Sequence, residues 1–394
     1  MADPTEVAVE AGDLLRALNG VRWVIPKRST LPIIQYAHLV IEGDGGIARI
    51  EGTDLEQAIL AEVPGVTFLS GSACSVMLPI RAVLMFLNGL MRGVKKHDKK
   101  PVHVKVQDHT LSLEAADVGC GEWADLPDPE TFPPLNQQNE VEKYTACDGK
   151  ELLTAFGYVC SAAAREDTRH KLTCVGVSNH SLVAADGFRL HIYESPTLTL
   201  GLPEECDATP VLIPRPVLLT LQRVFKGEKT IECGFAGNIP SHTGRVWFKS
   251  GVLTLASSLV SGTYPNWRQL VPGQSVSKLT FSAPLMLQRL DMIDQDMIDQ
   301  DVGGVRLEAD PPSGGESGMK LTVKQDGRRW KMTIPGTVET ETSVRLAFNP
   351  VYFRDAVKAF SLCTLGCNTP SSPGVFTGDV KGLMVVVMPM LVQW

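Results

Sequence analysis

A short apolar strand, a proline and an amphipathic helix follow one another three times in this chain, and this repeat constrains the fold more than any other feature. The copies span residues 76–90, 211–225 and 346–360. A helix tolerates proline at or before its first turn, because the N–H that proline lacks would have no partner there. The three prolines recur at a nearly constant interval, which predicts three similar domains; they are Pro79, Pro214 and Pro350.

A second element repeats in phase with the first. Residues 7–23, 144–165 and 279–293 each have the pattern of a short strand that runs into a helix, so each domain is expected to contain two helices. Polar stretches containing Pro or Gly at 137–141 and 273–276 favour boundaries there. The predicted domains are therefore 1–140, 141–276 and 277–394.

Runs of alternating polarity lie between the predicted helices, as is typical of antiparallel strands with one buried face. They occur at 48–52, 102–106, 110–114, 252–256 and 320–324. The segment 311–318 is rich in Pro, Gly and Ser, and we interpret it as a hairpin loop because no helix pattern follows it. The expected fold class is α+β, with antiparallel sheets and few helices.

The charge balance limits how the chain can bind a polyanion. Of its 394 residues, 37 are Lys or Arg and 44 are Asp or Glu, so the net charge is −7. Such a chain does not hold nucleic acid by overall attraction, and any DNA contact requires local basic patches.

Cysteine usage and hydropathy both favour a cytoplasmic protein. The nine cysteines are scattered without a C-x-x-C pair, so we expect neither a disulfide framework nor a zinc site. The first residues lack the basic and apolar regions of a leader peptide, and the apolar run 383–392 is too short to span a bilayer.

The predicted helices carry cations opposite their apolar faces. In residues 150–165, Leu152 and Phe156 repeat at helical spacing, whereas Lys150 and Arg165 lie on the other side. A charged face usually forms only a solvated surface. If three repeats surround an axis, however, these faces line a channel with cations that contact phosphates without reading sequence. The candidates are Arg81, Arg92, Lys150, Arg165, Arg215, Arg223, Lys226, Arg354 and Lys358.

Several short motifs, in order along essentially the whole chain, resemble those of the bacterial sliding clamps, the beta subunits of DNA polymerase III. They are Arg28–Ile33, Gly52–Glu56, Arg169–Leu172, Ala184–Leu190, Gly262–Pro272, Phe348–Tyr352 and Val386–Met390. The resemblance implies a three-domain chain that joins a second copy head to tail as a dimeric ring, with helices inside and antiparallel sheets outside. Such a ring encircles duplex DNA and is a processivity factor without catalytic activity or cofactor.

The resemblance also implies a pocket between the second and third domains. It receives short linear peptides from the replicative polymerase, the clamp loader and repair proteins. Its walls would be Arg169, Leu172, Gly187, Arg189, Leu190, Pro265, Leu270, Asn349, Tyr352, Val387, Met388, Pro389 and Met390. An ion pair between domains is the alternative for Arg169 and Arg189, and a buried last strand is the alternative for residues 384–392.

Two further surfaces are implied less directly. Arg28 matches a family position on a loop that leads toward the hole of the ring, and residues 95–100 are a basic loop for which a DNA role is an alternative to simple exposure. Ring closure would join an edge strand near 119–125 to the region 285–298. The candidate interface residues are Trp123, Leu285, Met286 and Leu290.

The chain departs from the family pattern at several positions. Ala185, Phe188 and Gln269 replace residues that are usual in the family, and a longer tail ends in Trp394. The repeated sequence at 291–300 has no counterpart that we can name. These differences lead us to expect that this chain has its own preference among partner peptides.

Two other classes of protein remain as alternatives. The best feature for an enzyme is an acidic cluster that could bind a hard cation, but its spacing lacks a calcium-loop pattern; it consists of Asp294, Asp296, Asp299 and Asp301. Nucleotide-binding, metalloprotease and nucleophile motifs are absent from the sequence. The second alternative is a DNA-binding protein that does not close into a ring.

Overall fold

The computed structural model describes the chain except for residues 1–3, 44–46, 95–98, 117, 136–140, 166, 240–242, 294–303, 313–317, 326–327 and 393–394. The chain forms two compact units. Unit 1 comprises Met1–Leu153, Pro216–Ile239 and Thr243–Leu259, and unit 2 comprises Thr154–Arg215, Pro240–His242 and Val260–Trp394. The division into three domains stays a prediction, because strands pair across both of the predicted boundaries.

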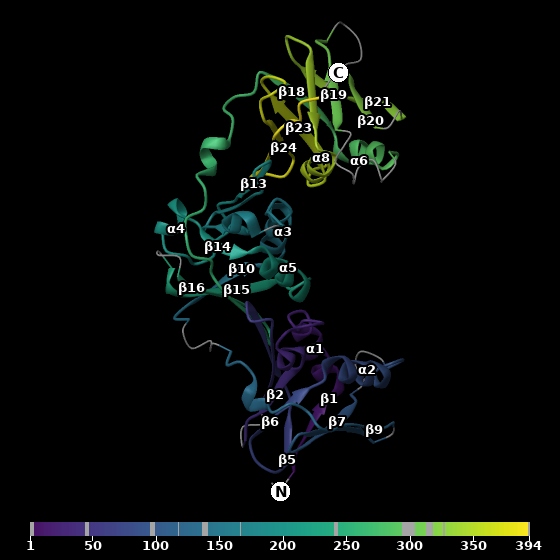
Figure 1. Cartoon of the computed structure of the whole chain (residues 1–394), viewed down its shortest axis with the longest axis vertical. Helices are drawn as coiled ribbons and strands as arrows, with labels where there is room; N and C mark the ends of the chain where they lie inside the picture. The colour runs from purple at the N-terminus through teal and green to yellow at the C-terminus, as the bar shows by residue number, and fades with distance from the viewer. Residues whose placement is uncertain are drawn as a thin grey trace. The chain divides into compact units, whose positions relative to one another are not determined.

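Unit 1 contains two antiparallel sheets (Figure 1). The smaller has the order β5 (Thr67–Ser70), β1 (Thr5–Glu10), β7 (Pro101–Gln107), β8 (Thr110–Ala115) and β9 (Gly119–Trp123). The larger has the order β10 (Tyr144–Asp148), β15 (Thr230–Asn238), β16 (Thr243–Ser250), β17 (Leu253–Ser258), β4 (Gln57–Val63), β3 (Ala48–Thr53), β2 (Ala37–Ile41) and β6 (Cys74–Leu78). The pairing of β4 with β17 joins strands that the sequence assigned to different domains.

Unit 2 is built on one twelve-stranded sheet. Its order is β14 (Val211–Pro214), β11 (Cys174–Val177), β12 (Ser181–Ala185), β13 (Arg189–Glu194), β25 (Leu383–Val387), β24 (Gly374–Gly378), β23 (Leu362–Cys367), β18 (Ser277–Ser282), β21 (Arg328–Glu339), β20 (Gly318–Gln325), β19 (Val305–Ala309) and β22 (Val344–Phe348). Strands β19 and β20 pair antiparallel, as expected for a hairpin, although residues 313–317 of their connection lie outside the described residues.

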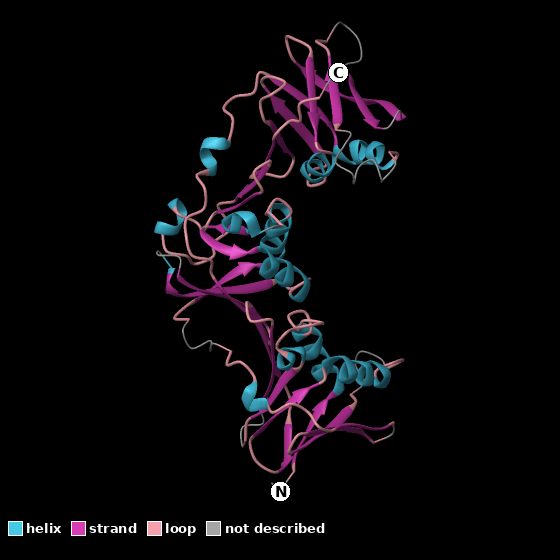
Figure 2. Ribbon diagram, viewed as in Figure 1, coloured by secondary structure: helices cyan, strands magenta, loops and turns pink. Residues whose placement is uncertain are grey.

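The six helices that the repeats predict are present (Figure 2). Three follow a strand directly: α1 (Ala11–Val21) after β1, α3 (Gly149–Cys160) after β10, and α6 (Ala283–Asp291) after β18. Three lie at the prolines: α2 (Ile80–Leu90), α5 (Arg215–Val224) and α8 (Pro350–Val357). In unit 1, α1 packs on α2 and on β3 and β4; in unit 2, α6 packs on α8. A short helix, α4, spans Glu205–Ala208, and in the described residues 3-10 helix spans Pro32–Gln35, Pro129–Thr131, Asp167–Thr173 and Trp267–Leu270.

The ends of the helices follow local chemistry. Pro79 precedes α2 and Pro350 is the first residue of α8, where Asn349 accepts hydrogen bonds from the backbone N–H groups of Val351 and Tyr352 at 2.9 and 3.1 Å. Helix α3 ends at Cys160, earlier than expected, because the N–H of Ala164 bonds to the carbonyl of Leu172 instead of continuing the helix.

Burial explains which strands could be recognised from alternation. Strand β7 alternates between exposed and buried residues, whereas every residue of β11 and β12 is buried. Beyond these strands, the core of unit 2 contains Phe348, Phe353 and Phe376, whose ring centroids lie 5.6 to 5.8 Å apart. Aromatic groups at this separation contribute favourable contacts beyond their burial.

His191 is a polar group inside this core. It is 1% exposed, and its Nδ1 lies 2.7 Å from the carbonyl oxygen of Tyr158, so Nδ1 carries the proton. Burial lowers the pKa of His191 to about 4, and the side chain is therefore neutral at physiological pH.

Replacing Phe376 by Ala should lower the free energy of unfolding of unit 2 by about 3 to 5 kcal/mol, because it leaves a cavity among three packed rings. Urea unfolding followed by tyrosine and tryptophan fluorescence measures the change. Leu391→Ala, at a residue that is 90% exposed, should have little effect. Equal losses for the two variants would contradict this account of the core.

Acid should destabilise unit 2 through His191. Its folded pKa of about 4 lies below the unfolded value of 6.5, so the unfolded state binds the proton more readily. The contribution of neutral His191 to the free energy of unfolding is fully present above pH 6.5. It is lost as the pH drops toward 4, which lowers the free energy of unfolding by about 3 kcal/mol in total. Urea unfolding across this range should show a shallower pH dependence for His191→Gln and an unchanged one for His170→Gln, at an exposed histidine.

Candidate functional site

The pairing of β13 with β25 organises the candidate site. Arg189 pairs with Val387 and Leu190 pairs with Val386 in an antiparallel register. Because alternate residues of a strand face opposite sides, Leu190 and Val386 share one face of the sheet, and Arg189 and Val387 share the other. Val387 is 0% exposed in the core of unit 2, which contradicts its predicted place in the pocket wall, whereas Val386 packs into a separate apolar cluster on the opposite face of the sheet.

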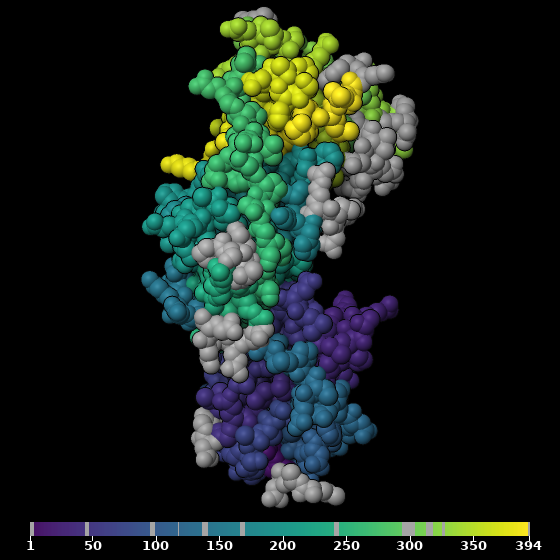
Figure 3. Space-filling model, turned by 60° about the vertical axis from the view of Figure 1, so that its left-hand side comes forward, coloured from purple at the N-terminus to yellow at the C-terminus, as the bar shows by residue number. Residues whose placement is uncertain are grey.

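An apolar floor covers the face of Leu190 and Val386. Its buried members are Cys174, Val183, Ala185, Leu190, Ile192, Leu212, Tyr264, Trp267 and Val386, with Leu172, Val260, Val271 and Met384 packed against them. Figure 3 shows the green segment that includes residues 260–270 running across the surface beside the yellow C-terminal residues. Pro265 and Leu270 lie exposed on this segment, and Leu270 is 57% exposed.

A surface groove of about 500 Å³ continues from this floor. Ile192, Trp267, Val271 and Met384 contribute to both the floor and the groove. The motifs did not identify these residues. Strand alternation could have found two of them, because Ile192 lies two residues after Leu190 and Met384 two before Val386.

A tight turn before β13 fixes the backbone at the other end of the strand. Gly187 has a φ of +95°, a conformation that L side chains rarely adopt. The carboxylate of Asp186 accepts hydrogen bonds from the N–H groups of Phe188 and Arg189, each at 3.0 Å. This turn leaves Phe188 60% exposed while Arg189 points into the protein.

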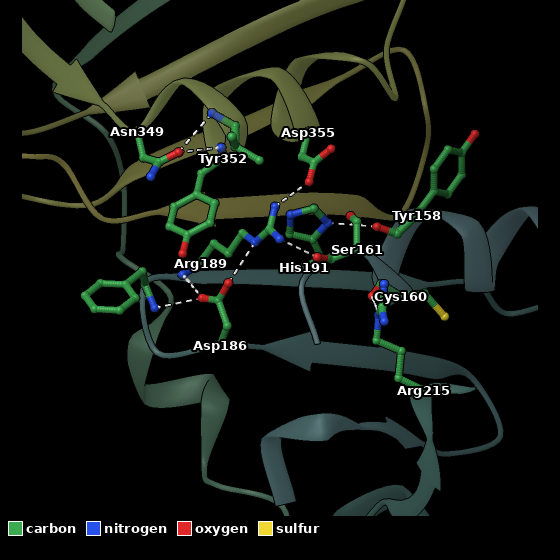
Figure 4. Close-up of polar contacts among 12 residues, drawn as sticks. Tyr158, Cys160, Ser161, Asp186, Arg189, His191, Arg215, Asn349, Tyr352 and Asp355 are labelled. Atoms are coloured by element: carbon green, nitrogen blue, oxygen red, sulfur yellow. Dashed lines mark hydrogen bonds and ion pairs between the residues drawn. The ribbon is translucent and has the colours of Figure 1, made fainter. Parts of the chain in front are cut away.

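The guanidinium of Arg189 is surrounded by partners (Figure 4). It donates to Asp186 at 3.0 Å, to Asp355 at 2.5 Å and to the carbonyl oxygen of Ser161, and it lies 4.5 Å from the ring centroid of Tyr352. Only 6% of the residue is exposed. Arg189 therefore forms ion pairs within the chain, as the alternative interpretation expected, and it links Tyr352 to the turn that contains Asp186.

Asp355 is the anionic partner that holds this arrangement. Burial alone would raise its pKa, but hydrogen bonds from Lys358 and Arg189 outweigh burial and keep the pKa below the usual value. The carboxylate is consequently ionised at neutral pH and matches the charge of Arg189.

Aromatic and sulfur-containing side chains form the exposed part of the site. Phe188 stacks on Tyr352 with a centroid separation of 6.4 Å. The N–H of Met388 donates to the carbonyl oxygen of Phe188 at 2.8 Å, and that of Met390 donates to Ala347 at 2.7 Å. Met388 is 45% exposed, and Pro389 and Met390 are half-buried. Phe188 appeared in the sequence only as a departure from the family pattern, yet it belongs to this surface.

The remaining predicted pocket residues divide into two groups. Leu172 packs against the apolar floor, and Asn349 caps the start of α8. The side chain of Arg169 and residue Trp394 lie outside the described residues.

The cations predicted to face DNA do not form one class. Arg28, Arg81, Lys150 and Arg223 are exposed. Arg92, Arg165 and Lys226 were predicted to lie on helix faces. This prediction is wrong, because they lie beyond the ends of α2, α3 and α5.

Three other cations have partners within the chain. Arg215 donates to the carbonyl oxygen of Cys160 at 3.0 Å, Arg354 pairs with Asp291, and Lys358 pairs with Asp355. The carboxylates of Asp291 and Asp355 reduce the charge that Arg354 and Lys358 offer to a polyanion. Residues 95–98 of the predicted basic loop are outside the described residues.

The predicted interface residues also differ in exposure. Strand β9 is at the edge of its sheet, and Trp123 is half-buried with its ring edge-on to Phe86 at 6.2 Å. Leu285 is half-buried, but Met286 and Leu290 are 0% and 1% exposed in the core of unit 2. The prediction that these two form an interface is wrong, because they face inward on α6.

The acidic cluster at 294–301 lies outside the described residues. Elsewhere in the part of the chain that the structure describes, no group of three or more His, Cys, Asp or Glu residues is placed to hold a metal ion. Within that same part, no helix is both long and apolar enough to cross a membrane.

Comparison with known proteins gives consistent matches along the chain. A sequence-family model described as DNA polymerase III beta subunit, central domain, matches residues 147–266. The beta sliding clamp of Escherichia coli K12 is 25% identical over 394 residues, which covers 97% of this chain and 98% of that protein. The beta sliding clamp of Caulobacter vibrioides is 21% identical, with 98% and 100% covered.

Solved structures agree with the sequence matches. The DNA polymerase III beta subunit of Thermotoga maritima superimposes with a TM-score of 0.80 at 20% identity, covering 99% of this chain and 100% of that one. The DNA polymerase sliding clamp of Bacillus subtilis gives 0.82 at 18% identity, with the same coverage. The fold is thus that of the beta clamps from end to end, and the sequence matches to beta sliding clamps cover nearly the whole chain.

Proposed function

We propose that this chain is a DNA sliding clamp, a processivity factor that encircles duplex DNA without reading its sequence. The observation that carries the proposal is the match of both sequence and fold to beta clamps over nearly the whole length of each protein. Two copies join head to tail into a ring, and each copy contributes the domains 1–140, 141–276 and 277–394. The protein acts in the cytoplasm, at the nucleoid, and has no catalytic role of its own.

The described cations support a weak grip on phosphates. Arg28, Arg81, Lys150 and Arg223 are exposed on a chain whose net charge is −7, so attraction is local. Contacts to phosphates carry no sequence information, and a ring held by few of them can slide. Ring closure uses the edge strand β9 with Trp123 on one copy and Leu285 on the other.

The site on unit 2 supports the tethering role. Its apolar floor accepts aliphatic or aromatic side chains, and Phe188, Tyr352 and Met388 form an exposed rim beside it. Methionine adapts to ligands of different shape, which suits a surface that receives peptides from polymerase, clamp loader and repair proteins.

A topological clamp should behave differently on circular and linear DNA. We expect the protein, loaded on nicked circular DNA, to survive moderate salt and to leave when the circle is cut, because only free ends release a closed ring. Gel filtration of the DNA complexes before and after cutting measures this. Retention on linear DNA, or loss from circles in moderate salt, would favour a phosphate-binding protein without a ring. Light scattering should also give the mass of two chains.

Replacing Tyr352 by Ala should weaken binding of a short peptide that ends in Leu-Phe by about tenfold, because large aromatic side chains carry much of the affinity of a binding surface. Tyr352→Phe keeps the ring and should retain most of the affinity. Calorimetric titration measures both variants. Leu69→Ala, at an exposed residue of unit 1, is the matched control; a loss as large there as for Tyr352→Ala would rule out this site.

A further inference from the structure

A second hollow, on unit 1, contains two of the cations proposed above to contact phosphates, Arg81 and Arg223, together with aromatic residues that have no role in that proposal. It lies where α1 ends and α2 begins, and its volume is about 940 Å³. Helix α2 and the loop that follows α1 contribute to its walls, which also include Arg223 from α5. It does not share a lining residue with the groove on unit 2.

The charge of this hollow is of one sign. Four cations line it, namely Arg22, Lys27, Arg81 and Arg223, and its described lining residues include no Asp or Glu. The chain as a whole has more acidic than basic residues, so this concentration of cations is local. A concave surface with four cations favours a ligand that carries several negative charges.

An exposed indole lies among these cations. Trp23 is 40% exposed, and the guanidinium carbons of Arg22 and Arg223 lie 5.0 and 5.3 Å from its ring centroid. Tyr36 is half-buried in the same hollow, and Met85 on α2 is 75% exposed. A purely structural contact between Trp23, after α1, and Arg223, on α5, would account for the cation–π contacts. It would not require the indole ring to stay exposed to solvent.

The combination of cations with an exposed aromatic ring favours single-stranded DNA over duplex DNA. The phosphates of a duplex need cations alone, because its bases are stacked on one another and hidden from an aromatic side chain. Single strands expose the faces of their bases, and proteins hold them with aromatic rings and arginines inside a positively charged groove. Trp23 with Arg22, Arg81 and Arg223 provides both parts.

We propose that this hollow binds single-stranded DNA, with an unpaired base stacked on Trp23 and the flanking phosphates held by Arg22, Lys27, Arg81 and Arg223. The inference rests on the proposed function, since it assumes that DNA is the polymer the protein surrounds. The hollow would engage the unpaired strand at a junction between duplex and single-stranded DNA.

Fluorescence anisotropy with labelled oligothymidine and with a duplex of the same length tests the proposal on the full-length protein. Trp23→Ala should weaken single-strand binding by about tenfold and duplex binding by less than about twofold. Trp23→Phe keeps a ring and should retain most single-strand binding. Arg81→Gln should weaken single-strand binding more than Lys105→Gln, which removes an exposed charge from β7 outside the hollow.

Equal losses on both DNA forms, or unchanged single-strand binding by Trp23→Ala, would overturn the proposal. Arg223→Gln provides a second test if Trp23→Ala does not fold, as judged by thermal unfolding. Retention on nicked circles separates the two proposals. If wild-type protein leaves circles in moderate salt, the clamp function fails; if it stays and only the single-strand result is negative, this inference fails alone.

Discussion

The pairing of β13 with β25 is the constraint on which the candidate site depends. It joins the strand that begins at Arg189 to the last strand of the chain, and it fixes which side chains reach each face of the sheet. One face receives Leu190 and Val386 and becomes the apolar floor. The other receives Arg189, whose ion pair with Asp355 ties the Gly187 turn to α8. A shift of one residue in this register would exchange the two faces and remove both features.

The sequence predicted the helices and strands better than their burial and tertiary contacts. Prolines 79, 214 and 350 identified three helix starts, because proline acts through its own backbone and needs no distant partner. Alternating polarity identified β7 and β8. It could not show that β11 and β12 are buried on both faces. The end of α3 depends on a bond between Ala164 and Leu172, and helical periodicity carries no information about that bond.

The candidate site was predicted in part, and the errors have a common cause. The motifs contain Leu172, Leu190, Asn349 and Tyr352, and each of these residues lies beside a turn, a cap or a strand end in the candidate site. They misassigned Val387, since choosing between it and Val386 requires the strand register. Met286 and Leu290 were taken as surface residues, although a short amphipathic helix needs them for its core. Side-chain partners such as Asp291 for Arg354 also depend on tertiary structure.

The position of β25 has a consequence for synthesis of the chain. This strand is translated after the other strands of its sheet, yet it lies between β13 and β24 inside a twelve-stranded sheet. Until it emerges from the ribosome, β13 and β24 each present an unpaired edge, and such edges associate readily with other strands. A nascent or prematurely terminated chain that lacks β25 would therefore be exposed to aggregation, and only a chain that includes this strand can cover both edges at once.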